Sequence, residues 1–156
     1  STSVKIIEEL RNGRHRSEIG LTVVGGEIRR DRGSVCGKSA EVFLNECATG
    51  GDVAVIGTTG YGGINGGTYS FFSDNLEESC LKTDFLQRAW LRDLAFDSSK
   101  LAPKMSTRIF ADLSPEAIDF VITDDGYESY ESHVKTFCNQ ANRCGVPVAI
   151  VKTKGA

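Results

Sequence analysis

The sequence predicts an α/β fold, with a mainly parallel sheet and helices on both of its faces. Short, almost wholly apolar runs alternate with amphipathic segments along the chain. Strands that are apolar throughout are typical of parallel sheets covered on both sides. Glycine or small polar residues follow several of these runs, as they do at the carboxyl edge of such a sheet. No linker or repeat interrupts the 156 residues, so we expect a single domain, 1–156.

The composition excludes several classes of protein. The net charge of −3 argues against a nucleic-acid surface in this chain. No apolar run approaches the ~20 residues that cross a bilayer, and the start has no signal-peptide pattern. We therefore expect a cytoplasmic protein. No CxxC or Cys/His cluster occurs among the five cysteines, so we expect reduced thiols, no metal and no cofactor: Cys36, Cys47, Cys80, Cys138 and Cys144.

The first third of the chain contains two predicted helices. Apolar residues at helical spacing predict a helix over Val4–Leu10, with Ser3 as its cap. The run 20–24 predicts a buried strand. The charged stretch 27–33 predicts a loop, and its arginines also suit the rim of an anion site. A second helix is expected over Lys38–Cys47.

The middle of the chain is organised around a glycine-rich stretch. The apolar run Val53–Ile56 predicts a strand, and the glycines and threonines of 57–68 predict a loop after it. Asp74 is then expected to cap a helix that extends to about Trp90. One side of this helix should carry Leu76, Cys80, Thr83, Leu86 and Trp90.

The C-terminal part continues the alternation of strands and helices. The expected elements are, in order, a strand at 94–96, a short strand or turn at 109–110, one helical turn from 114–116, a strand at 118–122, a helix with the stripe Tyr130, Val134, Phe137, Cys138 and Ala141, and a strand at 146–151. Gly145 should end the helix. Pro147 should lie at the start of the last strand or on a sheet edge, because it cannot donate to a ladder.

The glycine-rich stretch is the first candidate binding element. Glycine lets backbone N–H groups come close to a ligand, and Thr58, Thr59 and Thr68 offer small hydroxyls to anionic oxygens. A flexible surface loop is the alternative. No GxGxxG opens a helix and no Gly-Lys-Ser/Thr follows, so this is neither a dinucleotide fingerprint nor a Walker loop.

Polar residues follow the other predicted strands as well. Gly25-Gly26, Asp97–Lys100 and Thr123–Asp125 join 57–60 at the ends of strands, which meet at one edge when the crossovers are right-handed. N–H groups, hydroxyls and the Lys100 ammonium suit an anionic small molecule, above all a sugar phosphate. An ordinary surface position is the alternative for Lys100 and for Lys82, and Asp124-Asp125 can simply end a strand and cap the next helix.

Several ordered motifs carry a resemblance to a known family. They are Ser1-Thr2-Ser3 before a helix, Gly25 and Gly26 with Arg29, Ser34 with Gly37, Gly57-Thr58-Thr59-Gly60, Gly66-Gly67-Thr68, Glu78 with Lys82, Asp97-Ser98-Ser99-Lys100, and Ile122-Thr123-Asp124-Asp125. In this order they resemble the C-terminal effector-sensing domain of the DeoR family of bacterial transcriptional regulators. Thr2 stands where the family has asparagine.

The resemblance implies a fold shared with ribose-5-phosphate isomerases and CoA transferases. It also implies that the chain binds a phosphorylated sugar or related metabolite and so modulates DNA binding by a separate winged helix-turn-helix. That domain and the family's first phosphate loop are missing here, so the chain resembles a fragment. The ligand-binding residues implied are Ser1, Thr2, Ser3, Gly25, Gly26, Arg29, Gly57, Thr58, Thr59, Gly60, Thr68, Lys82, Asp97 and Lys100.

Three functions stay open from the sequence. The first is a sensor without catalysis. The second is an aldose–ketose isomerase of the same fold, with Lys100 and either Asp97 or Asp124 in the acid–base roles. The third is an oligomerisation module with a degenerate pocket. A homo-oligomer, dimer or tetramer, is expected because such regulators bind repeated operator half-sites.

Overall fold

The computed structural model describes residues 12, 26–30, 34–47, 51–64, 68–73, 75–102, 110–113, 117–126 and 129–153. The chain divides into two compact units, Ser1–Ala48 and Thr49–Ala156. The helix expected over Val4–Leu10, the strand at 20–24 and the helical turn at 114–116 lie outside the described residues. Each unit is described by itself below.

The first unit contains a two-stranded hairpin and a helix. β1 (Glu27–Arg29) pairs antiparallel with β2 (Ser34–Cys36), and α2 (Lys38–Cys47) follows. The helix is confirmed. The loop expected over 27–33 is wrong for 27–29, because backbone pairing with β2 outweighs the charged composition there; residues 31–33 lie outside the described part of the chain. Gly26 lies so close to β2 that an added Cβ would be 2.7 Å from the Cys36 carbonyl oxygen.

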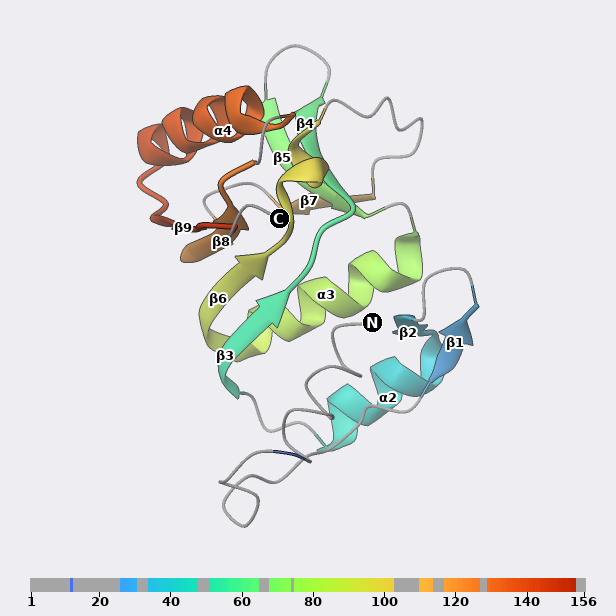
Figure 1. The fold of residues 1–156 in the computed structure, drawn as a ribbon. Helices are drawn as coiled ribbons and strands as arrows, with labels where there is room; N and C mark the ends of the chain where they lie inside the picture. The colour runs from blue at the N-terminus through green and yellow to red at the C-terminus, as the bar shows by residue number, and fades with distance from the viewer. Residues whose placement is uncertain are drawn as a thin grey trace. The chain divides into compact units, whose positions relative to one another are not determined.

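The second unit is built on a parallel sheet of four strands. They are β3 (Gly51–Ile56), β6 (Ala89–Ala95), β8 (Phe120–Asp124) and β9 (Val148–Val151), in the order β3-β6-β8-β9. Every neighbouring pair is parallel, and Figure 1 shows β3 and β6 side by side. The predicted α/β fold with a parallel sheet is confirmed. All four strands occupy somewhat different ranges from those expected.

A second, antiparallel sheet contains the glycine-rich stretch. β4 (Gly60–Ile64) pairs with β5 (Thr68–Ser73), and β5 pairs with β7 (Phe110–Leu113). The loop expected over 57–68 is therefore wrong for 60–64 and for residue 68, while 57–59 do form a loop and 65–67 lie outside the described residues. β4 tolerates its glycines because Tyr61, between them, is only 6% exposed and packs into the core.

Helix α3 (Leu76–Arg88) begins one residue later than expected and ends earlier. Its cap is Asn75, whose side chain accepts a hydrogen bond from the Glu78 N–H at 2.8 Å. The expected stripe is largely wrong: Leu76 and Cys80 are exposed, and the buried residues of the helix are Ser79, Leu81 and Leu86. Trp90 is not helical at all, because pairing with β3 starts β6 at Ala89.

Helix α4 (Glu131–Arg143) buries the predicted stripe at Val134, Phe137 and Ala141. It ends as predicted, with Gly145 at a φ of +73°. The Gly145 N–H donates to the Asn142 carbonyl at 3.1 Å and the Val146 N–H to the Ala141 carbonyl at 2.9 Å, which is a Schellman motif. β9 then forms a sheet edge with Pro147 just before it, as expected. The Pro147 carbonyl accepts from the Val121 N–H.

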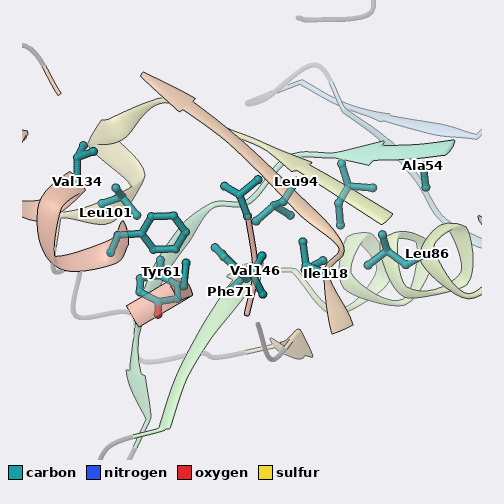
Figure 2. Packing of buried hydrophobic residues seen from close by; sticks show 13 residues of the cluster. Ala54, Tyr61, Phe71, Leu86, Leu94, Leu101, Ile118, Val134 and Val146 are labelled. Atoms are coloured by element: carbon teal, nitrogen blue, oxygen red, sulfur yellow. The ribbon is translucent and has the colours of Figure 1, made fainter. Parts of the chain in front are cut away.

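The core of the second unit joins the two sheets and two helices. Leu94 and Val121 of the parallel sheet are fully buried, and Leu86 of α3 and Val134 of α4 belong to the same cluster (Figure 2). Tyr61 and Phe71 of the hairpin complete it, with ring centroids 4.9 Å apart. Phe137 lies edge-on to the Tyr61 ring at 5.0 Å. The hairpin is thereby fixed against the sheet by aromatic packing.

The two faces of the parallel sheet differ. Ala54 and Leu94 face the core, whereas Val53 and Val55, which alternate with Ala54, are 52% and 61% exposed. Both α3 and α4 contribute residues to the single core cluster. The expectation that helices cover the second face of the parallel sheet as well therefore stays a prediction. In the part of the chain that the structure describes, no helix is long and apolar enough to cross a membrane.

The side chains of four of the five cysteines are described. Cys36, Cys80, Cys138 and Cys144 form no disulfide. Burial raises the pKa of the Cys138 thiol, which disfavours the reactive thiolate. Within the described ranges no cluster of His, Cys, Asp and Glu side chains suits a metal ion.

Candidate functional site at the carboxyl edge of the parallel sheet

The carboxyl ends of β3, β6 and β8 meet at one edge, as the sequence predicted for parallel strands. Gly57 follows β3, and an added Cβ there would lie 3.7 Å from the Ala95 carbonyl at the end of β6. The short helix η1 (Ser98–Leu101) follows β6, and its Ser98 N–H donates to Asp124 Oδ2, at the end of β8, at 2.9 Å. These contacts place 57–60, 97–100 and 124–126 next to one another.

The loop between β3 and β4 is closed by Thr58. Its hydroxyl oxygen accepts from the Gly60 N–H at 3.2 Å, and lies 2.7 Å from the Gly60 carbonyl and 3.0 Å from the Phe72 carbonyl. The Thr59 N–H donates to the same Phe72 carbonyl at 3.0 Å. A hydroxyl carries a single proton, so the Thr58 hydroxyl has one proton for the two carbonyls. Through these contacts Thr58 holds the loop against β5, and a ligand would compete for its hydroxyl.

The two glycines of this loop differ in their surroundings. At Gly57 an added Cβ meets only ordinary contact, whereas at Gly60 it would lie 2.4 Å from Cζ of the Phe72 ring. Gly60 is therefore required by packing. Gly57 is exposed and leaves the backbone open to the edge of the sheet.

Asp97 and Lys100 bracket η1. The Asp97 carboxylate caps the helix by accepting from the Ser99 N–H at 3.1 Å and from the Ser99 hydroxyl. The Lys100 ammonium lies 3.9 Å from Asp97 Oδ2, a loose ion pair with the two side chains 32% and 59% exposed. Lys100 is thus only weakly neutralised by this carboxylate.

Asp124 links the ends of β6 and β8. Burial alone would raise the pKa of its carboxyl, but hydrogen bonds from the Ser98 hydroxyl and from the N–H groups of Ser98 and Gly126 outweigh burial and hold the pKa below its ordinary value. The Gly126 N–H donates at 2.9 Å. Asp124 therefore stays ionised at neutral pH and acts as an acceptor that shapes this edge. It does not cap α4, whose N-cap is Tyr130 without a side-chain hydrogen bond.

Lys82 reaches the same region from α3. Its ammonium lies 2.8 Å from Glu78 Oε1 and donates to the Ser73 hydroxyl at 3.3 Å. Ser73 ends β5 and directly follows Phe72, whose carbonyl holds Thr58 and Thr59. The solvated position that was the alternative for Lys82 is wrong, since its side chain is only 17% exposed.

The structure brings together some of the predicted site residues and not others. Gly57–Gly60, Asp97 and Lys100 gather at the carboxyl edge, and Lys82 contacts Ser73, the residue after Phe72, whose carbonyl holds this loop. Thr68 pairs with Ile64, four residues along the hairpin from the Gly60–Phe72 pair, which is about 14 Å at ~3.4 Å per residue. The remaining members lie in the first unit, where the structure describes Gly26 and the backbone of Arg29, whereas Ser1, Thr2, Ser3 and Gly25 lie outside the described residues.

Three residues of this edge are absent from the predicted binding set. Ser73 can be assigned to this region only from the antiparallel pairing of β5 with β4, which no local sequence pattern indicates. Glu78 belongs to a motif without an assigned contact, and i,i+4 spacing from Lys82 is the signal that indicates an ion pair. The sequence indicates Asp124 only as a catalytic alternative or a cap.

The chain is an α/β domain of the kind that binds small molecules at the carboxyl edge of a parallel sheet, where it has glycines, a lysine and carboxylates. The model of one family, the DeoR C-terminal sensor domain, matches residues 1–125. The chain belongs to this family and is a ligand-sensing domain of a DeoR-type transcription regulator. No curated protein matches the chain.

Proposed function

We propose that this sensor domain binds a phosphorylated sugar or a related anionic metabolite at the carboxyl edge of the parallel sheet. The observation that carries the proposal is that Gly57 and Lys100 lie at that edge, while Lys82 contacts Ser73, the residue after Phe72, whose carbonyl holds the Gly57–Gly60 loop. An ammonium provides the charge that phosphate needs, and exposed glycine backbone admits its oxygens. Asp97 and Asp124 offer acceptors to sugar hydroxyls.

The bound metabolite changes operator binding by a separate winged helix-turn-helix domain of the regulator. By linkage, it does so only through a different affinity for the DNA-bound and free states. Such a regulator works in the cytoplasm as a homo-oligomer, dimer or tetramer. The molar mass from light scattering, with and without ligand, tests the oligomer.

The carboxylates at this edge favour a sensor over an isomerase. A general base that acts at neutral pH needs a pKa raised towards 7, whereas hydrogen bonds lower the pKa of Asp124. The Asp97 carboxylate already accepts a hydrogen bond from the Ser99 N–H as the cap of η1. Turnover of a pentose or hexose phosphate by the complete regulator would nevertheless overturn the assignment to a sensor.

The test is a thermal-shift screen of sugar phosphates, with the corresponding free sugars as controls. A ligand at ~100 times its dissociation constant adds about 2.7 kcal/mol of stability. We expect a shift with at least one phosphate and none with its free sugar. Lys100→Met should weaken the response, whereas Lys135→Met, on the exposed side of α4, should leave it unchanged. A protein that responds to no phosphorylated metabolite would instead be an oligomerisation module with a degenerate pocket.

A further inference from the structure

The Glu78–Lys82 ion pair is sheltered from water to an unusual degree for a pair within one helix. The two side chains are 15% and 17% exposed. The Lys135–Glu131 pair, which has the same i,i+4 spacing and a similar distance of 2.7 Å, is 72% and 62% exposed. Exposed pairs are largely screened by solvent, whereas a sheltered ammonium requires an anionic partner.

The sheltered ammonium lies beside the proposed ligand site. Lys82 donates to the hydroxyl of Ser73, which is only 3% exposed. The adjacent Phe72 carbonyl holds the loop that follows β3. A phosphate group at this loop would therefore lie one residue along β5 from the contact of the lysine that the Glu78 carboxylate already neutralises.

Two anions cannot share one sheltered lysine without strong repulsion, because the Coulomb energy between charges rises as the local dielectric falls. We propose that Glu78 is an internal competitor of the ligand: it neutralises Lys82 in the ligand-free state and gives Lys82 up when an anionic group binds. This inference rests on the proposed function of the site. It adds a built-in opposing contact, which sets how much anion is needed before the sensor responds.

The exchange would also give the sensor two distinct states. Glu78 lies in the first turn of α3, where the Asn75 side chain caps its N–H. Ser73 and α3 are separated by a very short connection. A change of partner at Lys82 thus alters contacts that fix α3 to β5. The ligand then has the differential interaction that a shift between states requires.

The experiment measures binding of inorganic phosphate to the chain and its variants, with sodium chloride at matched ionic strength as the reference. Glu78→Gln should bind phosphate at least about fivefold more tightly than the unaltered chain. Glu131→Gln removes the matched exposed pair and should bind as the unaltered chain does. The double variant Glu78→Gln/Lys82→Met should lose the gain.

Equal or weaker phosphate binding by Glu78→Gln would overturn the competition. If the unaltered chain still responds to a sugar phosphate and Lys100→Met does not, that result would leave the proposed function in place. If no variant binds phosphate and the sugar-phosphate screen is also negative, both proposals fall.

A second measurement needs no substitution, so it stands even if Glu78→Gln fails to fold. Carbon-detected NMR reports the side-chain carboxyl resonances of Glu78 and Glu131 during a titration with phosphate. The Glu78 resonance should move until saturation while that of Glu131 stays fixed. A Glu78 resonance that stays fixed at saturating phosphate would show that the ion pair survives binding and would overturn the proposal.

Discussion

Gly60→Ala is the most direct test of how the loop after β3 is built. An added Cβ at Gly60 would lie 2.4 Å from Cζ and 2.8 Å from Cε2 of the Phe72 ring. Phe72 is 6% exposed and is the direct antiparallel partner of Gly60. The ring therefore has little room to move, so either its rotamer or the pairing of β4 with β5 must change.

Overpacking of this kind costs about 1–3 kcal/mol. In a chain of this length, that should lower the melting temperature by about 2–10 °C. Calorimetry and urea denaturation measure the effect. Gly57→Ala is the matched control, since its nearest neighbour, the Ala95 carbonyl oxygen, lies 3.7 Å away; its cost should stay within about 0.5 kcal/mol. Equal costs for the two variants would refute the packing explanation.

A rescue experiment separates the clash from other effects of alanine. Phe72→Leu removes the aromatic Cζ and Cε atoms that the new Cβ would meet. In the Phe72→Leu background, Gly60→Ala should therefore cost clearly less than it does alone. If the cost is the same in both backgrounds, the ring is not the cause.

Three further predictions concern the rest of the second unit. Phe137→Ala should destabilise the chain by about 3–5 kcal/mol, because the Phe137 ring is 2% exposed and packs against three aromatic rings; Lys135→Ala, on the exposed face, is the control in urea denaturation. Gly145→Ala should cost about 1–2 kcal/mol through its φ of +73° alone, since no atom lies within 4 Å of an added Cβ; Gly145→Asn should cost less in the same assay. The lowered pKa of Asp124 means that its contribution is complete above the unfolded carboxyl pKa of ~3.9 and is lost as the pH falls through the lower folded value. Asp124→Asn should accordingly cost about 1–2 kcal/mol at pH 7 and markedly less at pH 3, and a cost that does not change between these pH values would contradict the assignment.

The sequence predicted those elements whose burial follows from local periodicity. The stripe Val134, Phe137 and Ala141 repeats at helical spacing, and α4 buries it as expected. Gly145 could be identified as the helix end because glycine adopts a positive φ without steric cost, whatever its neighbours are. The strand at 53–56 was found for a similar reason, since a short, uninterrupted apolar run that ends at a glycine is typical of a strand in a parallel sheet.

Local patterns failed where a distant residue decides the structure. Glycines at 60, 62 and 63 predicted a loop, but Gly60 faces a ring that is twelve positions along the chain and is brought there by the hairpin. Trp90 fitted the helical stripe of α3, yet pairing of Ala89 with Gly51 places it in a strand, where it is 88% exposed. Neither partner can be identified from a window of neighbouring residues.

The residues of the candidate site also divide into those that local patterns predict and those that depend on distant parts of the chain. The convergence of Gly57, Asp97 and Asp124 followed from the geometry of parallel strands, which needs only right-handed crossovers between them. The contact between Lys82 and Ser73 did not, because it depends on how the hairpin folds back over the sheet. Residues supplied by crossover strands can thus be predicted, whereas those supplied by the antiparallel hairpin require the structure.

Hydrogen bonds of the hairpin connect the loop after β3 to both helices. Thr58 ties the end of β3 to the Phe72 carbonyl, and the next residue of β5 accepts from Lys82 of α3. From β4, the Tyr61 hydroxyl donates to Gln140 Oε1 of α4 at 3.1 Å. A displacement of the loop after β3 would therefore reach α3 through the Lys82–Ser73 contact and α4 through Tyr61, whose ring belongs to the core. Since packed interiors resist gradual deformation, we expect these two hydrogen bonds to change before the aromatic packing around Tyr61 does if the proposed ligand displaces the loop.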